Sequence, residues 1–169
     1  MLSENLAEAI NKQINLEFYS AYAYLAMSAH FEGLGLPGAA QWMRAQSREE
    51  VVHAMKFFDF LNDRGEQVLL EAIEAPKIPH NGSVREMFEQ GLAGEEAVTS
   101  AINDIYTLAV QERDYPTQVM LQWFIEEQVE EEKSINDVLD QVKLIGDDKS
   151  ALFFLDRELG QRQEEEEEA

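Results

Sequence analysis

The chain has 169 residues, and 34 Asp and Glu against 13 Lys and Arg give it a formal net charge of −21. This charge disfavours nucleic acids and anionic membranes as partners and favours metal cations. Cysteine is absent, which excludes disulfide scaffolds, thiolate metal sites and cysteine nucleophiles. No apolar run is long enough to cross a bilayer or to serve as a signal peptide, so we expect a soluble, cytoplasmic protein.

Four long segments carry the 3.6-residue periodicity of amphipathic helices, and Gly or Pro separates them. We expect helices over about residues 3–32, 38–64, 83–113 and 116–145. Residues 83–86 read Ser-Val-Arg-Glu, which has the form of a capping box at the start of the third helix. No segment shows the alternation typical of a strand, so the fold class is all-α.

The lengths of the connections predict the topology. The first two helices and the last two are joined by short links, whereas residues 65–82 form a long connection that contains Pro76 and Pro79. Such a link can run from one end of a bundle to the other. The pattern therefore predicts a four-helix bundle made of two antiparallel hairpins and one long crossover connection.

The C-terminal part is expected to add a short fifth helix over about residues 150–161. Its apolar side chains should be buried against the bundle or between subunits; they are Ala151, Leu152, Phe154 and Leu155. The run of Glu at 164–168 should form a disordered acidic tail. We therefore expect one domain over residues 1–163, followed by a tail over residues 164–169.

The apolar stripe of each long helix is interrupted near its middle by a carboxylate. The four are Glu17, Glu50, Glu95 and Glu131. His53 follows Glu50 at i+3 and therefore lies on the same helix face. In an antiparallel bundle the helix midpoints share one level, so these side chains should meet in the interior.

Four buried carboxylates would be very costly without compensation, because desolvation and mutual repulsion both oppose their ionisation. A divalent metal removes that conflict. Oxygen-rich ligation with one imidazole suits iron or manganese, and bridging carboxylates suit a pair of ions. The pattern therefore predicts a dinuclear metal centre.

The same residues carry a family resemblance. Glu50-Val51-Val52-His53 has the Glu-x-x-His form of the ferritin-like di-iron proteins. The fourth helix instead offers Gln128-Val129-Glu130-Glu131, which resembles the bacterial non-haem ferritins rather than the bacterioferritins or rubrerythrins. Residues 13–17, 114–117 and 121–133 are also similar to the non-haem ferritins, and the resemblance extends over residues 1 to about 163.

This resemblance implies how iron is held. One iron would be bound by Glu17, Glu50 and His53, and the second by Glu50, Glu95 and Glu131, so that Glu50 bridges the pair. Three further carboxylates, together with a shared Glu131, stand where bacterial ferritins bind a third iron; they are Glu49, Glu127 and Glu130.

Other positions of the family pattern refine this expectation. Gln128 would be a hydrogen-bonding neighbour of the centre, and Tyr24 and Trp123 match aromatic positions near it. Val51 stands where bacterioferritins place the Met that ligates haem, so haem is not expected. Met27, Met43, Met55 and Met120 occur at helical core spacing and are expected to pack in the core.

The resemblance implies iron storage and detoxification. As a ferroxidase, the protein would oxidise Fe(II) with dioxygen and deposit Fe(III) as mineral inside a homo-oligomeric cage, usually of 24 subunits. One alternative is a di-iron oxidase or peroxidase of the rubrerythrin type without a cage. The missing second Glu-x-x-His and the absence of cysteine disfavour it. The other alternative, a metal-free helical interaction protein, leaves the core carboxylates unexplained.

Overall fold

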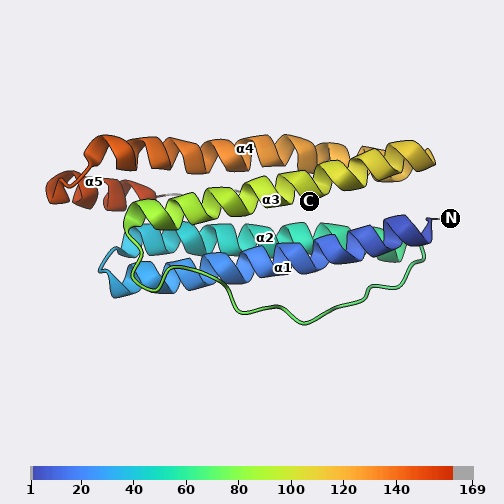
Figure 1. The fold of residues 1–169 in the computed structure, drawn as a ribbon, viewed down its shortest axis with the longest axis horizontal. Helices are drawn as coiled ribbons and strands as arrows, with labels where there is room; N and C mark the ends of the chain where they lie inside the picture. Colours follow the sequence, from blue (N-terminus) through green and yellow to red (C-terminus); the bar gives the residue numbers. More distant parts are fainter. Residues whose placement is uncertain (1, 162–169) are drawn as a thin grey trace.

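The computed structural model describes residues 2–161, which form five helices and contain no strand. The helices are α1 (Glu4–Gly33), α2 (Pro37–Asp63), α3 (Val84–Glu112), α4 (Tyr115–Ile145) and α5 (Lys149–Leu159). Figure 1 shows four long helices lying side by side, with α5 at one end. The all-α prediction and the four-helix bundle with a short fifth helix are confirmed. Each helix begins and ends within two residues of its predicted bounds.

 The largest difference lies at the end of α5, which stops at Leu159 rather than at residue 161.

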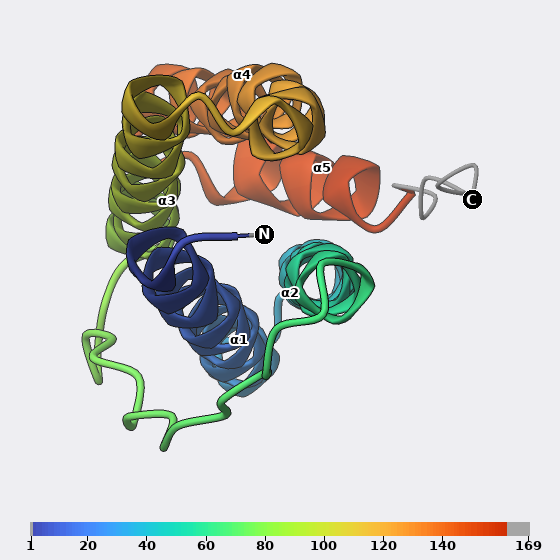
Figure 2. The same cartoon turned by 90° about the vertical axis from the view of Figure 1, so that its right-hand side faces the viewer.

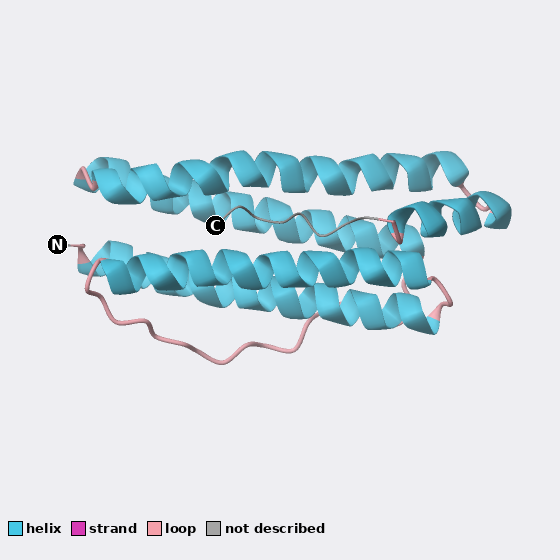
Figure 3. Cartoon of the chain, turned by 180° about the vertical axis from the view of Figure 1, so that it is seen from behind, coloured by secondary structure: helices cyan, strands magenta, loops and turns pink. Residues whose placement is uncertain are grey.

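The topology is the predicted pair of antiparallel hairpins. α1 packs on α2, α3 packs on α4, and α1 also contacts α3. The crossover segment, residues 64–83, runs along the outside of the bundle past α1 to the start of α3 (Figures 1 and 2). Viewed from behind, this segment is the one long stretch of loop among the described residues (Figure 3).

Local sequence signals set several helix ends. Ser83 and Glu86 form the complete capping box at the start of α3, in which each side chain meets the other residue's backbone N–H. Gly65 takes the left-handed conformation after α2, with φ of 75°. Asp114 caps α4 by accepting a hydrogen bond from Thr117 N at 3.0 Å, and it also forms a salt bridge of 2.7 Å with Arg64. This pair ties the end of α2 to the start of α4.

The core consists of two apolar clusters separated by a polar layer. One cluster includes Phe31, Met43 and Phe88, and the other includes Ile10 and Phe57 together with residues of α3 and α4. On every long helix the buried carboxylate lies in the sequence between the buried residues of one cluster and those of the other. Those of the layer are Gln13, Glu17, Gln46, Glu50, His53, Glu95, Gln128 and Glu131. The polar layer therefore lies about halfway along the bundle, with one apolar cluster on either side of it.

α5 packs against the end of the bundle through only part of its apolar surface. Leu155 and Leu159 are buried, and Asp156 accepts a hydrogen bond of 2.8 Å from Ala39 N. Gly38 permits this approach, because a Cβ there would lie 1.7 Å from the backbone oxygen of Asp156. Phe154 leaves 68% of its surface exposed. The apolar side chains of α5 were expected to be buried either against the bundle or between subunits. Leu155 is buried against the bundle, whereas Phe154 is not.

Two further sequence expectations concern burial and the chain end. Met55 is 39% exposed on α2, so its assignment to the core is wrong. It lies two residues after buried His53, which places it on the outward side of the helix. The predicted acidic tail lies outside the described residues. Within residues 2–161, no helix has an apolar stretch long and uncharged enough to cross a membrane.

Candidate metal centre

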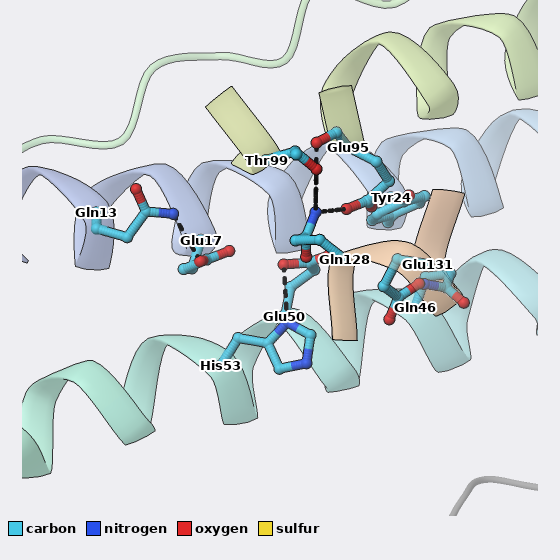
Figure 4. A network of polar contacts seen from close by, with 10 residues as sticks. All are labelled: Gln13, Glu17, Tyr24, Gln46, Glu50, His53, Glu95, Thr99, Gln128 and Glu131. Carbon is cyan, nitrogen blue, oxygen red and sulfur yellow. Dashed lines mark hydrogen bonds and ion pairs between the residues drawn. The ribbon is translucent and has the colours of Figure 1, made fainter. Parts of the chain in front are cut away.

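The buried polar layer contains side chains from all four long helices. Figure 4 shows Glu17 from α1, Glu50 and His53 from α2, Glu95 from α3 and Glu131 from α4 directed into the interior of the bundle. Each of these five side chains is at most 4% exposed. The helical period places them there, because each occupies the core stripe at the level where the two apolar clusters meet.

Glu17, Glu50 and His53 form the tightest group. Each offers one ligand atom, and the three atoms lie within 4.8 Å of one another. His53 Nδ1 lies 3.6 Å from Glu50 Oε2. Among the described residues, no donor forms a hydrogen bond with Glu17 Oε2 or with either carboxylate oxygen of Glu50. Buried acceptors in this condition cost free energy, so the group fits a bound cation.

The electrostatics of this group agree with that fit. Burial raises the pKa of Glu17 to about 7, against the hydrogen bond from Gln13. Burial raises the pKa of Glu50 as well, and the charges of Glu95, Glu17 and Glu131 add to the shift. Burial lowers the pKa of His53 to about 4, with Lys56 contributing. The neutral imidazole is the form that binds metal, and a cation would favour the ionised carboxylates beside it.

Glu131 occupies a second group with His53 and Glu127, whose ligand atoms also lie within 4.8 Å of one another. Gln46 Nε2 donates a hydrogen bond of 2.6 Å to Glu131 Oε2. Glu127 was expected only at a third iron site, beside Glu49 and Glu130. The structure places it next to the side chains expected to hold the iron pair.

Glu95 is held by hydrogen bonds rather than grouped with the other carboxylates. The Tyr24 hydroxyl donates to Glu95 Oε1, and Gln128 Nε2 donates to Glu95 Oε2 at 3.1 Å. Gln128 Nε2 also lies 3.2 Å from Thr99 Oγ1. Burial raises the pKa of Glu95, and the bonds from Tyr24 and Gln128 oppose that shift. Tyr24 and Gln128 thus orient this carboxylate.

The remaining predicted positions lie at the edge of the layer. Glu49 is half-buried and Glu130 is exposed, and neither belongs to the two groups described above. Trp123 is half-buried and packs edge-on against His53, with ring centroids 5.5 Å apart. Lys56 Nζ lies 4.1 Å from the centroid of the Trp123 ring.

Gln46 of the layer and the half-buried Thr99 beside it were not identified from the sequence. Gln46 is fully buried and lies one turn before Glu50 on α2. Thr99 lies four residues after Glu95 on α3. Its hydroxyl donates a hydrogen bond of 2.6 Å to Glu132 and lies beside Gln128. An i−4 spacing from Glu50 was the available signal for Gln46.

The chain is similar to known ferritins over nearly its full length. Residues 7–145 match the family model of the ferritin-like domain. The chain is 42% identical to a bacterial non-heme ferritin of Staphylococcus saprophyticus, covering 99% of this chain and 100% of the relative. It is 40% identical to a probable bacterial non-heme ferritin-like protein of Haemophilus influenzae, covering 95% and 96%.

Solved structures agree with these relatives. An open-pore ferritin from the hyperthermophilic archaeon Archaeoglobus fulgidus superimposes with a TM-score of 0.93 at 48% sequence identity, covering 96% of this chain and 100% of that one. A form of the same ferritin engineered to be closed gives a TM-score of 0.93 at 47% identity, with 96% and 99% covered. The fold, the polar layer and these similarities together assign the chain to the ferritin family.

Proposed function

We propose that this chain oxidises Fe(II) with dioxygen in its buried polar layer and stores the resulting Fe(III) as a mineral inside an oligomeric cage. Iron storage and ferroxidase activity follow from its membership of the non-haem ferritins. The observation that carries the assignment within the structure is the group of Glu17, Glu50 and His53. These three buried ligands converge, and three of their carboxylate oxygens lack a hydrogen-bond donor among the described residues.

In this proposal the iron substrate binds as a pair. Glu17, Glu50 and His53 hold one Fe(II), while Glu50, Glu95 and Glu131 hold the second, so Glu50 bridges. The support for the bridge is that Glu50 shares a group with Glu17 and that the charges of Glu95 and Glu131 act on its pKa. Carboxylates stabilise the harder Fe(III) ion and so favour oxidation.

Two iron ions at one site also match the electron count of the reaction. Two Fe(II) ions supply two electrons, and dioxygen takes them up with two protons to give hydrogen peroxide and two Fe(III) ions. Carboxylates that release their protons when iron binds supply a local source of those protons. Reduction by two electrons at once avoids the release of superoxide.

A third iron site is proposed beside the pair, with Glu49, Glu127, Glu130 and a shared Glu131 as ligands. The proximity of Glu127 and Glu131 supports part of this set. It also gives Glu127 a second possible role, because the same carboxylate lies near His53. Iron soaking distinguishes the two positions, since the ion nearest Glu127 would lie either with the pair or outside it.

We further propose a homo-oligomeric cage of 24 subunits, without haem, in the cytoplasm. Exposed aromatic side chains support burial between subunits: Phe153 and Phe154 are 59% and 68% exposed in the single chain. Adjacent exposed aromatic residues are typical of association surfaces. The alternative without a cage, a rubrerythrin-type oxidase or peroxidase, is separated from this proposal by particle mass.

The deciding experiment is anaerobic addition of Fe(II), followed by exposure to oxygen. We expect two irons per subunit to be oxidised rapidly, and three if the additional site fills. Continued cycles should give a soluble iron core within a particle of cage mass. Rapid oxidation in a particle with the mass of a single bundle or a small oligomer would favour the alternative, and absence of saturable Fe(II) binding would exclude both.

A further inference from the structure

A small cavity lies between α1, α3 and the crossover segment. Its volume is about 40 Å³. At its outer side it is lined by Lys77 and Gln90, which are exposed, and at its inner side by Tyr24 and Glu95, which are 2% and 1% exposed. The cavity therefore extends from the protein surface to the buried polar layer. It reaches the layer at Tyr24 and Glu95, and its lining does not include Glu17, Glu50 or His53.

Two glycines of α3, Gly91 and Gly94, line this cavity. Glycine is unfavourable inside a helix, so its presence calls for a reason. Neither glycine has a positive φ. A Cβ at Gly91 would meet Ile135 Cδ1 at 3.5 Å and Tyr24 Cε1 at 3.6 Å, which is ordinary contact, and a Cβ at Gly94 would meet no atom within 4 Å. Neither backbone conformation nor close packing requires glycine here. What the two glycines provide is open volume beside Tyr24.

The size and lining of the cavity restrict what can enter it. A water molecule takes about 30 Å³ in the liquid, so the cavity admits a molecule of two or three heavy atoms and excludes a chelate or an organic reductant. Ala23, Met27, Ile78 and the two glycines make much of its wall apolar. Lys77 at the outer side disfavours a cation such as Fe(II). The cavity therefore suits a small neutral molecule.

We infer that this cavity is the entry site through which dioxygen reaches the Glu95 side of the metal centre, and that Gly91 and Gly94 keep it open. The inference rests on the proposed ferroxidase function, which supplies dioxygen as the neutral substrate. It separates the path of the oxidant from the path of the metal ion, because a cation is disfavoured at this entrance.

The test fills the cavity with two methyl groups. The double variant Gly91→Ala/Gly94→Ala is compared with the parent and with Gly33→Ala, a matched change at an exposed glycine of α1 where a Cβ also meets no atom within 4 Å. Each protein is loaded with Fe(II) without oxygen and then mixed rapidly with buffers of graded oxygen concentration. We expect the oxidation rate to rise less steeply with oxygen in the double variant, by several-fold, while Gly33→Ala matches the parent. Anaerobic Fe(II) binding should be the same in all three.

A second measurement does not depend on activity. Crystals of the parent under xenon pressure should hold xenon in the cavity, because apolar cavities of suitable size bind this gas, whereas the double variant should not. Equal dependence on oxygen with equal Fe(II) binding, or a parent cavity without xenon, would overturn the inference. Failure of the parent to bind Fe(II) would instead count against the proposed function, and the xenon result would be unaffected by it.

Discussion

Gln46 Nε2 lies 2.6 Å from Glu131 Oε2, and this hydrogen bond joins α2 to α4 inside the polar layer. Gln46 is fully buried and Glu131 is 4% exposed. The bond fixes one oxygen of Glu131 and leaves the carboxylate directed into the layer. Gln46 is therefore a positioning residue for a proposed iron ligand, although it carries no charge and was not identified by its sequence position.

Replacing Gln46 by Leu should remove that donor while keeping much of the side-chain volume. We expect the apoprotein to lose about 1–3 kcal/mol of unfolding free energy, the usual cost of leaving a buried polar group short of a partner. We also expect weaker binding of the second Fe(II) with little change in the first. Gln41→Leu, on the exposed side of the same helix, is the control. Urea unfolding and anaerobic titration measure the two effects, and equal values for both variants would refute this role.

Glu50→Ala should abolish the fast oxidation phase more completely than Glu17→Ala, because the bridging position serves both irons. Stopped-flow absorbance after anaerobic loading measures this difference. Glu96→Ala, at an exposed position of α3, should behave as the parent. If Glu50→Ala oxidised two irons per subunit at the parent rate, the proposed centre would be wrong.

The same carboxylates should make the metal-free protein less stable as the pH rises. Folding raises the pKa of Glu17 from the ordinary 4.5 to about 7, so the folded state holds a proton that the unfolded chain has released in that range. Its contribution to stability is therefore greatest below pH 4.5 and is lost as the pH rises towards 7. Glu17→Gln should flatten this part of the profile of unfolding free energy against pH. An unchanged slope would mean that Glu17 ionises normally in the folded protein.

The salt bridge between Arg64 and Asp114 should give the opposite pH dependence. The hydrogen bonds from Arg64 hold the pKa of Asp114 well below its usual 3.8. The ionised Asp114 therefore contributes to the free energy of unfolding above pH 3.8, and this contribution is lost as the pH falls further below that value. Asp114→Asn keeps an N-cap acceptor for Thr117 but removes the charge, so we expect a loss of about 1–2 kcal/mol at pH 7 that shrinks under acid. Asp104→Asn, at an exposed position of α3, controls for net charge.

Glu130→Ala should leave oxidation of the first iron pair intact and change only later turnover, because Glu130 is exposed and lies outside the two ligand groups. Crystals soaked with iron and repeated Fe(II) additions test both parts. The third site would be removed from the proposal if no metal bound near Glu49, Glu127 and Glu130.

Changes in α5 should separate assembly from folding. Truncation before Ser150 removes Leu155 and Leu159, which are buried against the bundle, so it should weaken both the subunit and the cage. Replacing Phe153 and Phe154 together by Ser should weaken the cage while the bundle keeps its stability, because these side chains are exposed in the single chain. Glu158→Ser on the same helix is the control. Light scattering gives the particle mass, and a full-sized shell from the double Phe variant would refute this assembly role. Removal of residues 164–169 should have little effect.

The helices, the crossover and the level at which the carboxylates gather could all be predicted from the amino-acid sequence. Helical periodicity is a local property, and the positions of Glu17, Glu50, Glu95 and Glu131 in their apolar stripes follow from counting 3.6 residues per turn. Ser83 with Glu86 and Gly65 likewise mark helix ends through short-range backbone chemistry.

Which side chains meet within that level depends on how the helices pack against one another. Periodicity gives the face of a helix but not the rotation of one helix against another or the rotamer of each side chain. For this reason the sequence did not predict that Gln46 reaches Glu131, that Glu127 joins His53, or that Tyr24 and Gln128 hold Glu95. The cavity beside Gly91 also exists only where α1, α3 and the crossover segment come together. Contacts between residues far apart in the chain depend on how the packed helices are oriented, and no local pattern encodes that orientation.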